Sequence, residues 1–86
     1  MKSVKWRKSF EKDFRKLGGR QQMALARAYD LFIKDVYDKK LRRHKLHGKY
    51  KCLESIDVTP DLRALFLETD DEYIFYHLKN HNQLYK

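Results

Sequence analysis

The sequence predicts a small α+β domain in which an N-terminal strand and a two-helix hairpin pack on a small, mainly antiparallel twisted sheet. Apolar residues first recur at the spacing of amphipathic helices and then, after Gly48, at every second position, which is the spacing of strands. The order of elements is therefore one strand, two helices and a run of antiparallel strands. The chain has 86 residues, 42% of them hydrophobic, which is enough for one core and a single domain over residues 1–86.

The N-terminal half is expected to contain a short strand followed by two helices. Residues 4–6 form the strand, and the first helix carries apolar side chains at i, i+4 and i+7, namely Phe10, Phe14 and Leu17. Ser9 is a candidate N-cap, and Gly18-Gly19 end this helix and begin the hairpin turn. The second helix is expected from residue 21, with its core positions at Leu25, Ala28, Tyr29, Phe32, Ile33, Val36 and Tyr37.

The C-terminal half is expected to form three antiparallel strands. Ile56 and Val58 alternate with polar neighbours, and the Thr-Pro-Asp-Leu sequence over residues 59–62 is a turn signal. Residues 62–67 are mostly apolar in both alternating sets, which predicts a central strand covered on both faces. The third strand is expected over residues 73–78.

Cysteine usage and hydropathy exclude several classes of protein. Cys52 is the only cysteine, so no internal disulfide can form, and a reducing compartment fits. The first ten residues are charged and carry no apolar run typical of a signal peptide, and no stretch approaches the roughly 20 apolar residues that cross a bilayer. We therefore expect a cytoplasmic protein without a membrane partner.

Charge is distributed unevenly along the chain. The formal net charge is +8, and residues 1–51 hold 17 Lys and Arg against five Asp and Glu, whereas residues 52–86 hold three against seven. A basic half of this strength predicts a polyanionic or acidic partner, either nucleic acid or an acidic protein segment. Solvated helix faces on a basic protein are the simpler alternative.

The segment from His44 to the C-terminus contains the types of side chain that cleave RNA without a metal ion. Such cleavage needs a base for the 2′-hydroxyl, an acid for the departing 5′-oxygen and a cation for the phosphate. His81, just past the third strand, is the first candidate for proton transfer, because the unperturbed histidine pKa is about 6.5. Arg63 is the candidate phosphate ligand, with an internal salt bridge to Asp57 or Asp61 as its alternative role.

Other residues of this segment are expected to support the chemistry. Those expected to contact RNA lie in the basic run before the sheet: Lys45, His47, Lys49 and Lys51. Tyr85 is expected to stack on a base or assist at the phosphate. His77 is expected to share the sheet surface of Phe75, as a core or supporting residue. The spacing of His44 and His47 also permits a zinc site, but no clear third ligand or paired cysteine accompanies them, so no metal or other cofactor is expected.

Three stretches, HKLHG from residue 44, DVTPDLRALF from residue 57 and HNQLY from residue 81, together resemble the RelE/YafQ group of bacterial type II toxins. The similarity covers nearly the whole chain, because SVKWRKSFEKDFRKL near the start also resembles the family's opening strand and helix. The resemblance implies a ribosome-dependent mRNA endonuclease that a cognate antitoxin neutralises. The expected partners are therefore mRNA, the ribosome with its ribosomal RNA, and an acidic antitoxin segment.

The resemblance also implies roles for individual residues. His44 matches a functional histidine of the family, and Asp61 matches an aspartate that orients a histidine or accepts a proton. Asp61 follows Pro60 in a turn, where an aspartate often only satisfies backbone amides. Asp57 stands where some members have a further histidine, and Leu62 stands where YafQ-type members have a tryptophan.

Two other functions are compatible with parts of the sequence. A toxin of the same fold without nuclease activity, resembling the ParE group that targets DNA gyrase, would have no shared use for the His, Asp, Arg and Tyr side chains. A basic RNA- or DNA-binding module needs charge and aromatic residues but no poised histidine. The leading hypothesis is an endoribonuclease that cuts mRNA in the ribosomal A site.

Overall fold

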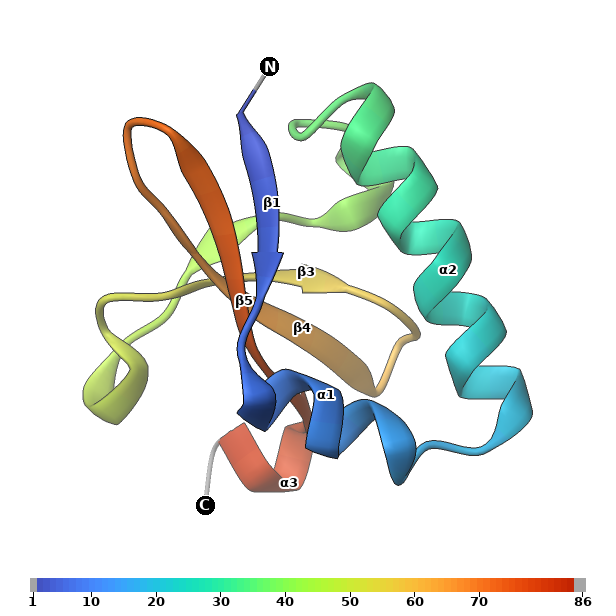
Figure 1. The fold of residues 1–86 in the computed structure, drawn as a ribbon. Coiled ribbons are helices and arrows are strands. Elements are labelled where there is room, and N and C mark those ends of the chain that lie inside the picture. Colours follow the sequence, from blue (N-terminus) through green and yellow to red (C-terminus); the bar gives the residue numbers. More distant parts are fainter. Residues whose placement is uncertain (1, 85–86) are drawn as a thin grey trace.

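The computed structural model describes residues 2–84 and contains a five-stranded sheet with its two longer helices on one face (Figure 1). In chain order the elements are β1 (Ser3–Trp6), α1 (Lys8–Arg15), α2 (Gly19–Lys34), the 3-10 turn η1 (Lys39–Leu41), β2 (His44–Lys45), the 3-10 turn η2 (Gly48–Tyr50), β3 (Glu54–Asp57), β4 (Leu62–Glu68), β5 (Glu72–Asn80) and α3 (His81–Leu84). The strands lie in the order β1-β5-β4-β3-β2, with β1 parallel to β5 and all other pairs antiparallel. The predicted α+β class is confirmed. None of the helices within residues 2–84 combines the length and the apolar character needed to cross a membrane.

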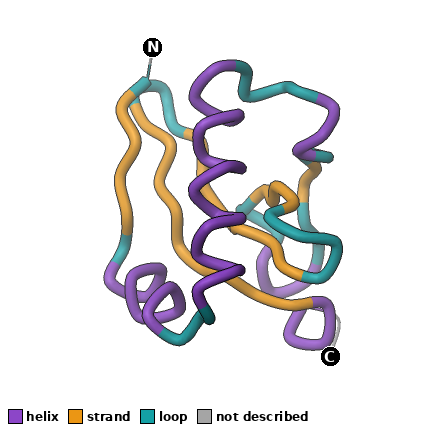
Figure 2. Tube along the Cα trace, turned by 90° about the vertical axis from the view of Figure 1, so that its right-hand side faces the viewer, coloured by secondary structure: helices purple, strands orange, loops and turns teal. Residues whose placement is uncertain are grey.

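One hydrophobic core lies between the helices and the sheet, and Figure 2 shows α2 running across the covered face. Phe32 of α2 is fully buried. Its ring centroid lies 5.3 Å from that of Phe66, 5.0 Å from that of Tyr73 and 5.5 Å from that of Phe75, each in an edge-on arrangement. Edge-on aromatic pairs are favourable beyond the area they bury, so this cluster attaches α2 firmly to β4 and β5.

The second helix ends earlier than its apolar pattern indicates. Asp35 has extended backbone angles (φ −157°, ψ 102°), so α2 stops at Lys34. The carboxylate of Asp35 then accepts a hydrogen bond from the backbone N–H of Tyr37 at 2.9 Å. The expectation that Tyr37 lies in the core is wrong, because its side chain is 71% exposed.

The first helix completes the edge of the sheet beyond the point where β1 ends. Ser9 Oγ donates a hydrogen bond to the carbonyl of Tyr76 at 2.6 Å, and Asp13 Oδ2 accepts one from the N–H of Leu78 at 3.0 Å. These side chains satisfy backbone groups of β5 that an edge strand would leave unpaired. The expectation that Ser9 is an N-cap is wrong, since Arg7 holds that position and Ser9 lies inside α1.

A bulge in β5 changes which of its side chains face the core. β4 pairs with β5 as Leu65↔His77 and Phe66↔Phe75, so Tyr76 is an extra residue on β5. Leu65 and Phe66 are consecutive and therefore point to opposite faces of the sheet. His77 consequently lies on the face opposite to Phe75. The expectation that His77 and Phe75 share a surface is wrong.

Arg43 links the chain before β2 to two strands of the sheet. Its side chain is only 8% exposed. It donates hydrogen bonds to both carboxylate oxygens of Glu54 at 2.8 and 3.0 Å, and to Glu68 at 2.7 Å. Its guanidinium also lies 5.1 Å from the ring centroid of Phe66. The hydrogen bonds to Glu54 and Glu68 raise the pKa of Arg43 above its usual range. The two carboxylates thus offset the cost of burying the guanidinium.

Replacing Arg43 by alanine should lower the free energy of unfolding by about 3 kcal/mol, because two partly buried carboxylates lose their counter-charge. Urea denaturation followed by circular dichroism measures this change. Arg27→Ala is the matched control, since Arg27 is exposed on α2 and its loss should change stability by about 0.5 kcal/mol or less. Equal losses in the two variants would contradict the role given to Arg43.

Stability should also depend on the ionisation of Glu68. The hydrogen bond from Lys2, followed by that from Arg43, lowers the pKa of Glu68 in the folded protein. The resulting stabilisation is present above the unfolded value of about 4.3 and is lost as the pH falls through the lower folded value. Between about pH 5 and pH 3, the melting temperature of Glu68→Gln should therefore fall less steeply than that of the wild type. Parallel curves would show that Glu68 does not contribute.

Candidate functional site

The sheet face opposite α1 and α2 carries two of the predicted site residues, His44 and Arg63. We call it the outer face and define it by the residues that alternate with the core positions: His44, Ser55, Asp57, Arg63, Leu65, His77 and Lys79. Four of these form one row across the strands, through the pairs His44↔Ser55, Ser55↔Leu65 and Leu65↔His77. Neighbouring strands lie about 4.8 Å apart, so His44 and His77 are separated by roughly 14 Å.

A second row on the outer face is charged. Asp57 pairs across the strands with Arg63, and Arg63 pairs with Lys79. Arg63 Nε lies 3.1 Å from Asp57 Oδ1, and Arg42 Nε lies 3.7 Å from Asp57 Oδ2. The salt bridge to Asp57, expected as the alternative role of Arg63, is therefore present. Two cations on directly opposite positions create a positive potential, which favours a bound anion such as a phosphate.

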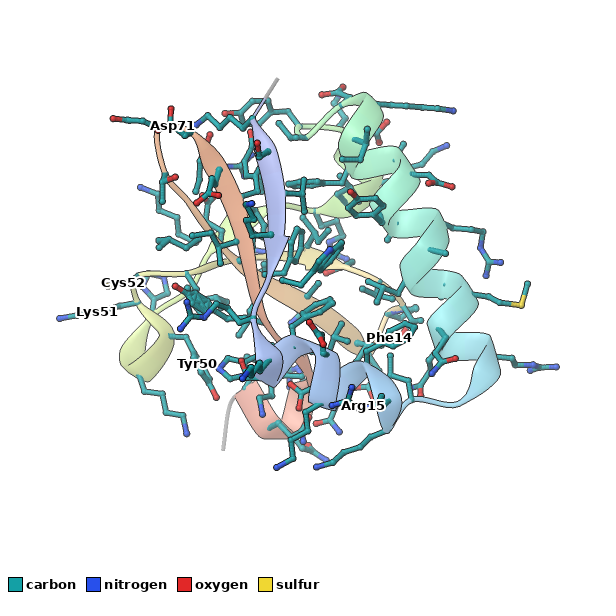
Figure 3. The ribbon with its side chains drawn as sticks, viewed as in Figure 1. Phe14, Arg15, Tyr50, Lys51, Cys52 and Asp71 are labelled. Atoms are coloured by element: carbon teal, nitrogen blue, oxygen red, sulfur yellow. The ribbon has the colours of Figure 1, made fainter. Side chains whose placement is uncertain are left out.

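The segment between β2 and β3 folds over part of the outer face. Leu46 and Leu65 are buried but lie outside the main core. Gly48 has a φ of 70°, in the left-handed region that glycine adopts without strain, and the chain turns there. Tyr50 follows, and its ring centroid lies 5.8 Å from that of His77. In Figure 3 the Tyr50 side chain lies close to the body of the protein, whereas Lys51 extends away from it.

A hollow of about 360 Å³ lies beside this segment. It is lined by His44, Lys45, Leu46, His47, Gly48, Tyr50 and Leu84. The hollow thus brings the two histidines of the basic run next to α3, the helical turn that begins at His81. His44 Nδ1 is 2.9 Å from the carbonyl of Arg42, and His44 Nε2 is 3.4 Å from Ser55 Oγ. Because a carbonyl only accepts, Nδ1 carries the proton and Nε2 faces the hydroxyl as an acceptor when the ring is neutral.

Asp61 and His81 lie at the same end of the sheet. Leu62↔Asn80 is the last pair of the β4–β5 ladder, and Asp61 precedes Leu62 as His81 follows Asn80. The position of His81 is stabilised by a reciprocal cap, since Gln83 N–H donates to Asn80 Oδ1 and Asn80 N–H donates to Gln83 Oε1, each at 2.9 Å. Asp61 and Gln83 line a common hollow at this end.

The sequence allowed the Asp61 carboxylate to serve only as an acceptor for backbone N–H groups of the turn before β4. In the structure another side chain accepts them. Thr59 Oγ1 accepts the backbone N–H groups of Asp61 and Leu62 at 3.3 and 3.0 Å. The Asp61 side chain is exposed. A hydroxyl two residues earlier therefore provides the turn contacts, and the Asp61 carboxylate remains suited to a role at the site.

The remaining predicted residues fall into three groups. His47, Lys49 and Lys51 are exposed on the covering segment. Lys45 is exposed too, but its strand partner is Glu54, so it alternates away from His44. Tyr85 lies outside the described residues 2–84. Within those residues no three His, Cys, Asp or Glu side chains converge as metal ligands.

Sequence reasoning did not assign His77, Lys79 or Asp13 to the site. Lys79 could have been found from its alternation with Leu78 in the third strand. His77 could not, because the bulge at Tyr76 leaves no mark in the apolar pattern. Asp13 comes from α1, and its proximity to β5 results from tertiary packing.

Solved structures of bacterial toxins have the same fold. No protein-family model matches the sequence, and no curated protein matches it either. YafQ from E. coli strain BL21(DE3) superposes with a TM-score of 0.81 at 19% identity over 100% of both chains. The E. coli DinJ-YafQ toxin-antitoxin complex gives 0.79 at 20% identity over 99% of this chain and 98% of the other. A copper-bound mutant toxin from Helicobacter pylori gives 0.70 at 28% identity over 99% and 100%.

These similarities define the class of fold. The chain has the α+β fold of the RelE/YafQ-type toxins, as the sequence resemblance implied. More distant structures of the same kind include the Mycobacterium tuberculosis RelBE2 toxin-antitoxin complex, with a TM-score of 0.65 at 18% identity over 93% of this chain and 98% of the other.

If the second row binds phosphate, Lys79→Ala should weaken the binding of single-stranded RNA and reduce its dependence on salt. Loss of one phosphate contact lowers the slope of log K against log salt concentration by about 0.7. Fluorescence anisotropy with a labelled oligonucleotide, repeated over a range of salt concentrations, measures the slope. Lys34→Ala, at the exposed end of α2, is the matched control and should leave the slope unchanged. Identical slopes in both variants would contradict a phosphate contact at Lys79.

Proposed function

We propose that this protein is the toxin of a type II toxin-antitoxin system and that it acts as an endoribonuclease on mRNA in the ribosomal A site. The observation that best supports this proposal is the composition of the outer face. His44 and the cations Arg63 and Lys79 lie there, and Asp61 and His81 lie at the adjoining end of the sheet. The fold shared with YafQ, the partner of DinJ in a toxin-antitoxin complex, supports the toxin role.

The chemistry requires no metal ion. A base removes the proton of the 2′-hydroxyl, and the 2′-oxygen forms a bond to the adjacent phosphorus. The bond from phosphorus to the 5′-oxygen breaks as an acid protonates that oxygen, which leaves a 2′,3′-cyclic phosphate and a 5′-hydroxyl. His44 and His81 are the candidate proton-transfer groups, and Asp61 orients one of them. Arg63 stabilises the extra charge on the phosphate through its guanidinium, and Tyr85 stacks on a base.

The expected partners follow from charge and from the similar structures. A formal net charge of +8 favours both the ribosomal and the messenger RNA. Lys45, His47, Lys49 and Lys51 would contact their backbones. DinJ-YafQ and RelBE2 are toxin-antitoxin complexes, which supports an antitoxin partner here as well. An acidic antitoxin segment would complement the basic half of this chain.

A translating extract tests the proposal. The purified protein is added, and mRNA 5′ ends are mapped by primer extension. We expect cuts within translated message that disappear in His81→Ala. Cys52→Ser, at an exposed position, is the control and should cleave like the wild type.

Two outcomes would contradict the nuclease proposal. Intact mRNA together with inhibition of DNA gyrase would favour a toxin of the ParE kind. Binding of RNA without cleavage, in the wild type and in His81→Ala alike, would favour a plain RNA-binding module.

A further inference from the structure

We propose that His77 removes the proton from the 2′-hydroxyl of the RNA and that Asp13 positions its imidazole ring. This inference rests on the proposed nuclease function and assigns its base to one residue. His77 would be a catalytic residue because it would touch the reacting oxygen. Asp13 would be a positioning residue, since it would act only through His77.

The bulge in β5 brings His77 onto the outer face. In a regular strand, residues two positions apart point the same way, so the ring would lie in the core with Phe75. The bulge at Tyr76 reverses this alternation. His77 therefore lies in the row that starts at His44 and is two residues from Lys79 in the charged row. Its side chain is 30% exposed, so a nucleotide can reach the ring.

Asp13 is held beside the ring by the backbone of β5. Its Oδ2 accepts the N–H of Leu78 at 3.0 Å and lies 3.7 Å from His77 Nδ1. An anchored carboxylate at Nδ1 favours the tautomer that carries its proton on Nδ1. The other nitrogen, Nε2, is then free of a proton and can accept one. A carboxylate positions the base of serine proteases in the same way.

The groups around His77 keep it in the form that a base requires. Tyr50 of η2 contacts the ring on one side, with Lys49 next to it, while Lys79 follows along β5 and Asp13 approaches from α1. Burial is the main cause that lowers the pKa of His77 below its ordinary value, and Lys79 adds to it, whereas Asp13 opposes it. His77 is therefore mostly neutral at neutral pH, which is the form that accepts a proton.

The step is balanced in atoms and charge. His77 Nε2 takes the 2′-hydroxyl proton as the 2′-oxygen bonds to phosphorus, and the bond from phosphorus to the 5′-oxygen breaks. The 5′-oxygen receives its proton from His81, which directly follows β5. Arg63 and Lys79 lie beside His77 on the same face and stabilise the additional negative charge on the phosphate.

Two measurements on the full chain test the inference. The first is the cleavage rate of His77→Gln, which should be about 10²–10⁴-fold lower than that of the wild type. The second compares the NMR titration of the His77 ring with the acidic limb of the cleavage rate against pH. The midpoint of the His77 titration and the acidic limb of the rate profile should move together. Both should shift to lower pH in Asp13→Asn and to higher pH in Lys79→Gln, because these variants remove charges of opposite sign. The amide oxygen introduced by Asp13→Asn can still accept the N–H of Leu78, so the edge of the sheet is retained.

Each result either supports or overturns the inference. Cleavage by folded His77→Gln within about threefold of the wild type, with His81→Ala inactive, would overturn it and leave the nuclease function standing. If His77→Gln does not fold, the two charge variants decide: an acidic limb that stays in place while the His77 titration moves would show that another group is the base. A wild-type protein that cuts no RNA would overturn the proposed function and this inference together. Cys52→Ser is the control and should change neither the cleavage rate nor the pH at which His77 titrates.

Discussion

The packing of Phe32 against Phe66, Tyr73 and Phe75 determines which side chains reach the outer face. Side chains alternate along a strand, so a slip of one residue would move Arg63 to the core side of the sheet and Phe66 to the outer face. Burial of the aromatic rings excludes that arrangement. The register of β4 against its neighbours follows, and with it the position of Arg63 between Asp57 and Lys79. The composition of the outer face is therefore a consequence of core packing on the other side of the sheet.

The irregular part of β5 affects both the closure of the sheet edge and the side chains of the outer face. A bulge leaves backbone groups of a strand without regular partners, and β5 is exposed at this point because β1 has already ended. Ser9 and Asp13 of α1 satisfy the groups of Tyr76 and Leu78. The same carboxylate then lies beside the ring of His77. One contact between α1 and β5 thus closes the sheet edge and orients a titratable side chain on the outer face.

The regular spacing of apolar residues along helices and strands explains which parts of the structure could be predicted from the sequence and which could not. The helical stripe that includes Phe32 and the alternation around Ile56 identified the elements, because each period was preserved in the fold. The faces of Asp57 and Arg63 followed from the same alternation. The position of His77 did not, since an inserted residue reverses the alternation without altering composition. The end of α2 before Tyr37 could not be predicted either, because it depends on the extended backbone of Asp35 and on the hydrogen bond that its side chain accepts.

The uneven charge of the chain has two physical roles that the sequence alone could not separate. Part of the basic half is used inside the protein, where Arg43 joins Glu54 and Glu68. Carboxylates of the acidic half thus neutralise cations of the basic half. The separation of positive from negative charge is therefore smaller in the folded protein than along the sequence. Lys49 remains exposed on the covering segment and Lys79 lies on the outer face. Their field favours a bound anion and at the same time the neutral form of His77, so in the proposed nuclease the charges that hold the phosphate would also keep the base ready to accept a proton.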